Sequence, residues 1–284
     1  MATYSDLNST ILSDASRLLP FGLDGVEVAN PLDPGNASVI GFIGHLAQTL
    51  LAGGNDPDRL AGGLGNDVLM GYGGDDSLHG GAGWNMILGG AGDDILDVRW
   101  LTDPDRGDLS HADWSAAKRM ASDWLFGGSG NDSLFGSFGS DLLHGGSGND
   151  MLSGQDGNDL LDGGDGNDLL EGDAGRDTLL GGAGRDTLDG QAGDDNLYGG
   201  AGDDLFVFSG GGDVVMDFTD GDIVQISSRL EGVTLGSAED VADFAVDLGD
   251  AGTLIDFGQG DSVLLHGVAY DDVTSDPGRF FTVV

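Results

Sequence analysis

A nine-residue period runs through the middle of this 284-residue chain and limits its fold more than any other feature. Units of the form G-G-x-G-x-D-x-L-x start at residues 53, 62, 71, 80 and 89, then at 127, 136, 145, 154, 163, 172, 181, 190 and 199, with a degenerate unit, KRMASDWLF, at Lys118. Each unit has one reliably large apolar residue, which is too little for a core of its own. The units must therefore stack and bury a shared core.

The sixth position of the unit is aspartate in every copy but one. The exception is Asn85, which follows Trp84, and this pair predicts a weak or absent metal site in that turn. A solvated acidic face would scatter its charges, whereas this register is locked to glycine. The fourteen aspartates, all candidate metal ligands, are Asp58, Asp67, Asp76, Asp94, Asp123, Asp132, Asp141, Asp150, Asp159, Asp168, Asp177, Asp186, Asp195 and Asp204.

The eighth position is leucine in all units but two, which carry Ile87 and Phe206. A short strand around this position, such as Asp168-Leu169-Leu170, points alternate side chains to opposite faces. We therefore expect a ladder of apolar residues inside the stack. The glycine-rich remainder of each unit is expected to be a turn, because glycine adopts positive φ and lets backbones approach closely.

The turns combine aspartate carboxylates with backbone carbonyls, which are hard oxygen ligands. Such a set suits Ca²⁺, which takes six to eight oxygens in flexible geometry, better than Mg²⁺. Calcium would also offset the repulsion between stacked carboxylates. The carbonyl ligands that we expect belong to glycines in the first and fourth positions of the unit: Gly62, Gly65, Gly127, Gly130, Gly145, Gly148, Gly163, Gly166, Gly181 and Gly184.

Units such as GGLGNDVLM, GGSGNDSLF, GGDGNDLLE and GGAGRDTLD resemble the RTX (repeats-in-toxin) family over residues 53–207, with one interruption. The resemblance implies an all-β fold, a parallel β-roll in which two units make one 18-residue coil. It also implies calcium between each unit and the second unit along. We expect about 11 ions, or about 13 if the stack continues across the interruption.

We expect five segments: an N-terminal cap with an amphipathic helix (1–52), a first repeat block (53–97), a helical insertion (98–117), a second repeat block (118–207), and a C-terminal β cap with a secretion signal (208–284). The cap helix is predicted over 38–51, where apolar residues follow helical spacing. After residue 207, GDVVMDFTDGDIVQISS and GTLIDFGQGDSVLLHGV alternate in the manner of antiparallel strands.

The insertion gathers aromatic and basic residues. All four tryptophans lie in or beside it, with Arg99, Arg106, Lys118 and Arg119. One interpretation is a helix packed on the roll by its own tryptophans, with its basic residues near aspartates. The alternative is a recognition site for an acidic polysaccharide or a protein partner.

Charge and composition restrict the classes of molecule that can bind this chain. The chain has 50 acidic and 10 basic residues, a formal net charge of −40 and no cysteine. Nucleic acid and anionic membranes are therefore poor direct partners, and no disulfide holds the chain together. The opening MATYSDLNSTILSD lacks the features of a Sec signal peptide. The C-terminal segment resembles those that carry type I secretion signals in RTX proteins.

We expect no enzymatic activity, because the sequence has neither H-E-x-x-H nor G-x-S-x-G. The leading hypothesis is a type I-secreted protein at the surface of a Gram-negative bacterium or outside it. It would fold on calcium and serve a structural, adhesive, matrix or surface-layer role. Its partners would be calcium, the type I secretion machinery, and polysaccharide or further copies of the chain. The alternatives are a host-directed membrane-active effector and a polysaccharide-binding accessory module.

Overall fold

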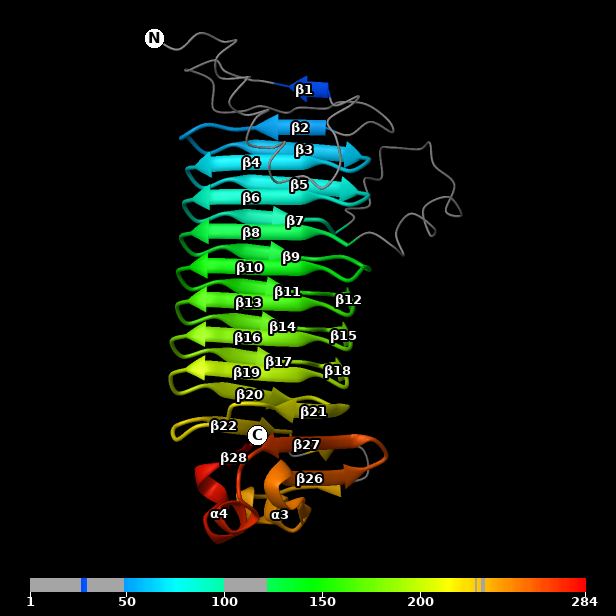
Figure 1. The fold of residues 1–284 in the computed structure, drawn as a ribbon, viewed down its shortest axis with the longest axis vertical. Helices are drawn as coiled ribbons and strands as arrows, with labels where there is room; N and C mark the ends of the chain where they lie inside the picture. The colour runs from blue at the N-terminus through cyan, green and yellow to red at the C-terminus, as the bar shows by residue number, and fades with distance from the viewer. Residues whose placement is uncertain (1–26, 30–48, 100–121, 228, 231–232) are drawn as a thin grey trace.

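The computed structural model describes residues 27–29, 49–99, 122–227, 229–230 and 233–284. These residues form a tall stack of coils (Figure 1). Each coil contributes one strand to each of two facing sheets. Sheet A is built, in spatial order, from β1 (Glu27–Ala29), β2 (Thr49–Ala52), β4 (Val68–Gly73), β6 (Met86–Ala91), β8 (Trp124–Ser129), β10 (Leu142–Ser147), β13 (Leu160–Asp165), β16 (Thr178–Ala183), β19 (Asn196–Ala201), β21 (Gly212–Val215), β27 (Asp261–His266), β26 (Gly252–Gly258) and β25 (Ala245–Asp247).

Sheet B faces sheet A and runs in the same order along the chain. Its strands are β3 (Arg59–Leu64), β5 (Ser77–Ala82), β7 (Ile95–Asp97), β9 (Ser133–Phe135), β11 (Met151–Ser153), β14 (Leu169–Glu171), β17 (Thr187–Asp189), β20 (Leu205–Phe208), β22 (Ile223–Ile226) and β28 (Phe281–Val283). Two small ribbons accompany them: β12 (Asp156–Gly157), β15 (Ala174–Gly175) and β18 (Ala192–Gly193), and the pair β23 (Arg229–Leu230) and β24 (Val233–Thr234).

The strand register confirms the expected parallel β-roll. In sheet A, Leu143 of β10 pairs with Leu161 of β13, so that equivalent residues lie one coil, or 18 residues, apart. In sheet B, Leu152 pairs with Leu170 at the same spacing. Two nine-residue units therefore make one coil, with one unit per sheet and a turn at each edge.

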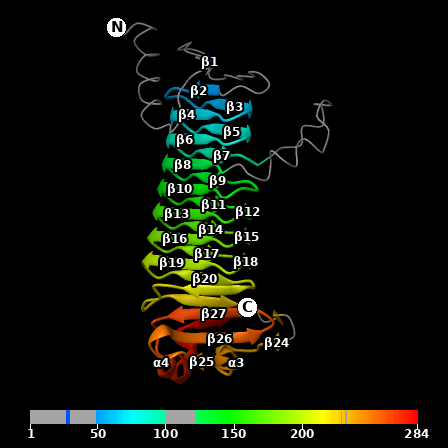
Figure 2. The same ribbon diagram turned by 45° about the vertical axis from the view of Figure 1, so that its right-hand side comes forward.

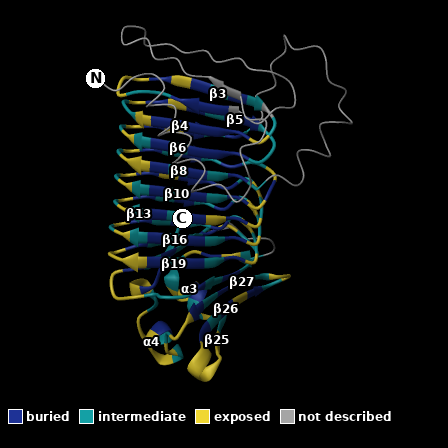
Figure 3. Cartoon of the chain, turned by 45° about the horizontal axis from the view of Figure 1, so that its top comes forward, coloured by how far each residue is buried: buried dark blue, intermediate teal, exposed yellow. Residues whose placement is uncertain are grey.

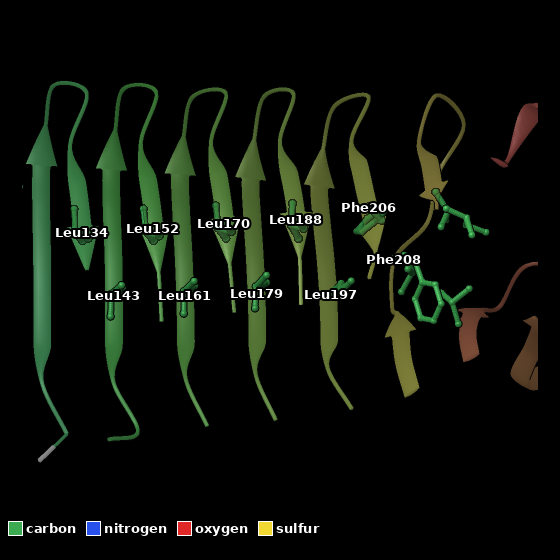
Figure 4. Close-up of a cluster of buried hydrophobic side chains, with 14 of the residues drawn as sticks. Leu134, Leu143, Leu152, Leu161, Leu170, Leu179, Leu188, Leu197, Phe206 and Phe208 are labelled. Carbon is green, nitrogen blue, oxygen red and sulfur yellow. The ribbon is translucent and has the colours of Figure 1, made fainter. Parts of the chain in front are cut away.

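Residues in the eighth position form the core. Their side chains point inward from both sheets in two facing rows (Figure 4). In the middle of the roll, Leu134, Leu143, Leu152, Leu161, Leu170, Leu179 and Leu188 have no exposed surface. Burying a leucine contributes roughly 1.5–3 kcal/mol, so the apolar rows stabilise the stack even though glycine dominates the turns. Figure 3 shows the same division, with buried strands between exposed edges.

The stack continues across the insertion. Ile87 of β6 pairs directly with Leu125 of β8, 38 residues later. The excess over one coil is 20 residues, which equals the length of segment 98–117. The insertion therefore leaves the roll at the edge after β7 without breaking either sheet.

Two expectations at the ends need correction. The helix predicted over 38–51 is wrong at its end, because Thr49–Ala52 form β2, which pairs with β4. Residues 38–48 lie outside the described part. After residue 207, β21 and β22 are parallel to their neighbours and extend the roll. Among the described residues, antiparallel pairing is confined to β23 with β24 and to β26 with its two neighbours, β25 and β27, whereas β27 is parallel to β21.

The C-terminal cap closes one end of the roll (Figure 2). It adds two short helices, α3 (Ala238–Ala242) and α4 (Tyr270–Ser275), whose Val241 and Val273 are fully buried. Aromatic rings replace the leucines here: Phe208 stacks on Phe257 at 5.7 Å between ring centroids. The cap thus covers the apolar rows where the repeats end.

Candidate metal centre: two ladders of buried aspartates

Residues in the sixth position line both edges of the roll. The first edge holds the turns that lead from sheet B to sheet A, and the second edge holds those that lead from sheet A to sheet B. First-edge residues are Asp67, Asn85, Asp123, Asp141, Asp159, Asp177, Asp195 and Asp213; second-edge residues are Asp58, Asp76, Asp94, Asp132, Asp150, Asp168, Asp186, Asp204 and Asp222. All are buried although most are carboxylates.

From Asp76 and Asn85 onward, one side-chain oxygen of each rung is held by the coil before it. The backbone N–H of Asp132 donates to Oδ1 of Asp150, and that of Asp150 donates to Oδ1 of Asp168, both at 2.8 Å. The same bond repeats along both edges, which makes a continuous ladder. It fixes each side chain in one orientation and leaves the second oxygen, Oδ2, facing into the turn.

That second oxygen is the unsatisfied group. Among the described residues, a fully buried Oδ2 without a hydrogen-bond partner occurs in Asp76, Asp94, Asp132, Asp150, Asp159, Asp168, Asp177, Asp186, Asp195, Asp204 and Asp213. A buried acceptor without a partner costs about 1–3 kcal/mol, and a buried charge costs more. A regular row of such atoms indicates that a cation completes the turns.

Burial also changes how these carboxyls hold protons. It raises the pKa of Asp76 to about 7 and that of Asp159 to about 8, with neighbouring carboxylates adding to the rise and a backbone N–H opposing it. The pKa of Asp132 rises to about 7 for the same reason. Without a cation, these groups in the folded roll therefore keep their protons to a higher pH than an ordinary aspartate does.

Backbone carbonyls complete the set of oxygens. A Cβ added to Gly145 would collide with Oδ2 of Asp150 and would lie 2.7 Å from the carbonyl oxygen of Gly163 in the next coil. These two oxygens therefore converge on a space that only glycine leaves open. Gly146 and Gly148 adopt φ of 115° and 133° and lie against carbonyls of the coil before.

This donor set fits calcium. Among the described residues, no three histidine or acidic side chains converge, so a metal here must take carbonyl oxygens in addition to carboxylates. Mixed carboxylate and carbonyl coordination in a flexible turn is the preference of Ca²⁺. When bound, calcium would supply the positive charge that the stacked carboxylates lack.

The structure places the sequence-predicted residues as follows. The fourteen aspartates all occupy ladder rungs, and the expected glycines in the fourth position lie in the turns beside them. The expectation of a turn is wrong for the glycines in the first position, because the strands run on into the next unit: Gly62, Gly127, Gly145, Gly163 and Gly181 lie in β3, β8, β10, β13 and β16. Their role as ligands stays a prediction. Two rungs were missed: Asp213 and Asp222 extend the ladders beyond the last regular unit. Their nine-residue spacing from Asp204 was the available signal, although the glycine pattern had faded there.

Comparison with known families decides the identity of the repeats. The RTX calcium-binding nonapeptide repeat matches residues 52–83, 61–96, 121–152, 144–179, 153–188 and 180–215. The chain contains RTX calcium-binding repeats. RTX repeats bind calcium, which agrees with the unsatisfied oxygens on both edges of this RTX roll.

The chain also has a partial likeness to a larger solved protein. The crystal structure of the extracellular lipase LipA from Serratia marcescens aligns with 85% of this RTX chain and 40% of the lipase, at 21% identity and a TM-score of 0.32. The chain thus spans less than half of the lipase's length. No curated protein sequence matches this chain. In the described part of the RTX chain, no helix is long and apolar enough to cross a membrane.

The base of the insertion is partly described. Arg99 forms an ion pair with Asp97, with Nη2 and Oδ2 3.1 Å apart, and its guanidinium lies 3.6 Å from the ring centroid of Phe135. Trp84 and Trp124 meet edge to face at 5.5 Å between ring centroids. The other basic residues of this region, Arg106, Lys118 and Arg119, lie outside the described ranges, so the recognition alternative stays a prediction.

Proposed function

We propose that this chain is a type I-secreted protein that folds on calcium outside the cell and then serves as a structural, adhesive, matrix or surface-layer component. The observation that carries the proposal is the row of buried Oδ2 atoms that have no hydrogen-bond partner. A fold with this defect on both edges is complete only with cations in its turns.

Calcium would make folding depend on whether the chain is inside or outside the cell. A ligand that binds the folded roll and not the unfolded chain stabilises the roll by mass action. At the low calcium level of a cell interior, a chain of net charge −40 with orphaned buried carboxylates would stay unfolded. Outside the cell, calcium would fold it, which suits export by a type I machinery.

The shape supports a structural role. The parallel strands β2, β4, β6, β8, β10, β13, β16, β19 and β21 follow one another in sheet A. At about 4.8 Å per strand, these coils rise about 40 Å as a stiff rod. We also propose that the chain acts without catalysis, because its buried carboxylates are committed to the ladders. Its partners would be polysaccharide or further copies of itself.

The test is a calcium titration of EDTA-treated protein, followed by far-UV circular dichroism and light scattering. We expect a cooperative transition from coil to β structure, with magnesium at equal concentration as the control. A rise in scattering at the transition supports matrix or lattice assembly. A chain already folded without calcium at neutral pH, or calcium-dependent turnover of an ester, peptide or glycoside, contradicts the proposal.

A further inference from the structure

The rung at Asn85 is built differently from the others on its edge. Its amide Nδ2 donates to the carbonyl of Gly83 at 3.1 Å and to that of Gly81 at 3.4 Å. Its Oδ1 still accepts the backbone N–H of Asp67 at 3.1 Å, as the ladder requires. The amide therefore occupies the turn as a donor, and it satisfies two backbone carbonyls there.

Val98 closes the same turn from the next coil. In the regular rungs, a Cβ on the first glycine of the turn would meet a carbonyl oxygen of the following coil. On Gly80 it would instead meet Cγ1 of Val98, at 2.8 Å. Val98 is the first residue of the insertion and is buried. A methyl group thus takes the place of an oxygen ligand.

The next two rungs are satisfied by Ser137. Its hydroxyl donates to Oδ2 of Asp123 at 3.2 Å, and its backbone N–H donates to Oδ2 of Asp141 at 2.6 Å. Both Oδ1 atoms keep their usual ladder bonds. Asp159, one coil further on the same edge, has a buried Oδ2 without a partner.

The opposite edge shows no such interruption at this height. Asp94 and Asp132 flank the insertion on the second edge, and both have a buried Oδ2 without a partner. The difference is therefore confined to the edge from which the insertion leaves.

We propose that Asn85, Asp123 and Asp141, here called the sealed rungs, hold no calcium and are closed by hydrogen-bond donors of the protein. The inference rests on the proposed calcium-dependent folding. It makes the roll asymmetric at the height of the insertion: there the second edge keeps its open oxygens for calcium, whereas the first edge is free of cations over three successive coils.

The test counts bound calcium by nondenaturing mass spectrometry of the full chain. Two matched pairs of variants are compared: Asp141→Asn with Asp159→Asn, and Asp123→Asn with Asp177→Asn. We expect the count to stay at the wild-type value in Asp141→Asn and Asp123→Asn. It should fall by one or more ions in Asp159→Asn and Asp177→Asn.

Asp123→Asn is included because it should keep the fold. The Ser137 hydroxyl can accept a hydrogen bond from the new amide as readily as it donates one to the carboxylate. A loss of ions in Asp123→Asn or Asp141→Asn equal to that in its partner variant overturns the inference. Failure of the proposed function has a different signature: the wild-type chain would bind no calcium, and all four variants would match it at zero.

Discussion

The backbone N–H of Asp94 donates to Oδ1 of Asp132 at 2.7 Å, although 38 residues separate the two in the sequence. The bond has the same geometry as ladder bonds between residues 18 apart, such as that from Asp132 to Asp150. The pairing of adjacent coils therefore does not depend on the length of chain that joins them.

Deletion of residues 99–118 tests whether the pairing of coils is independent of the insertion. The change removes 20 residues, restores the 18-residue spacing from Asn85 to Asp123 and keeps Val98 in place. We expect the shortened chain to undergo the same calcium-dependent transition, measured by circular dichroism. Deletion of 99–114, which leaves the register four residues out of step, is the control and should abolish a single cooperative transition.

Leu152→Ala removes a side chain that has no exposed surface in the core. We expect a loss of about 2–5 kcal/mol in the free energy of unfolding, from lost transfer energy and the cavity left behind. Chemical denaturation in saturating calcium measures it. The neighbouring Met151→Ala is the control, because Met151 points outward and is 42% exposed; its effect should stay within about 0.5 kcal/mol. Equal losses would contradict the two-row core.

Gly146→Ala places a side chain where φ is 115° and where a Cβ would collide with the carbonyl of Gly128. We expect destabilisation of more than about 1 kcal/mol and a higher calcium concentration at the midpoint of folding. Gly278→Ala serves for comparison, since nothing lies within 4 Å of a Cβ there. A neutral Gly146→Ala would show that the coils can move apart.

Asn85→Asp restores the repeat consensus but should destabilise the roll. The new carboxylate would be buried against the Val98 methyl, with carbonyls of its own turn facing it. We expect a loss of about 1–3 kcal/mol in saturating calcium, seen as a lower thermal midpoint. Asn149→Asp makes the same chemical change at an exposed position and should be close to neutral. A stabilised Asn85→Asp would mean that calcium enters the turn.

The pH dependence follows from the raised pKa values. Asp76, Asp132 and Asp159 have folded-state pKa values of about 7, 7 and 8 against an ordinary value of 3.8. The folded state therefore binds more protons, and stability of the calcium-free roll is present at low pH and lost as pH rises towards 8. Circular dichroism in EDTA at pH 5 and pH 8 should show more β structure at pH 5.

Calcium and protons then compete for the same oxygens. Calcium binding at pH 7 should release protons, and its affinity should rise with pH. Calorimetry in two buffers of different ionisation enthalpy measures the release. A heat of binding that is the same in both buffers would contradict the competition.

Much of this structure could be predicted from the period alone. Nine-residue spacing of Leu indicates a shared apolar core, because alternation along short strands separates the core row from the outer face. Two units per coil followed only from the resemblance to RTX repeats, since the period does not say how many units close a coil. The direction of pairing in β21 and β22 was not predictable in this way. Val215 and Val224 are buried between half-buried neighbours, and this alternation is the same whether the adjacent strand is parallel or antiparallel.

The site was predictable only in part. Position in the unit identified the aspartates, but it could not separate rungs that have a donor from rungs that lack one. Asp141 and Asp159 look alike in sequence, and only the turn backbone at Ser137 distinguishes them. Asn85 was visible as an exception, whereas the closing of its turn by Val98 depends on where the insertion begins.

The aromatic cluster around Phe208 and Phe257 covers one end of the core once, whatever the number of coils above it. Each coil touches only the coil before it and the coil after it, so stability grows by nearly equal increments along the stack. Duplication or loss of a whole 18-residue coil would leave the end cover and all other pairings intact. The length of the rod can therefore change by one coil at a time, through duplication or deletion in the gene, while the fold stays the same.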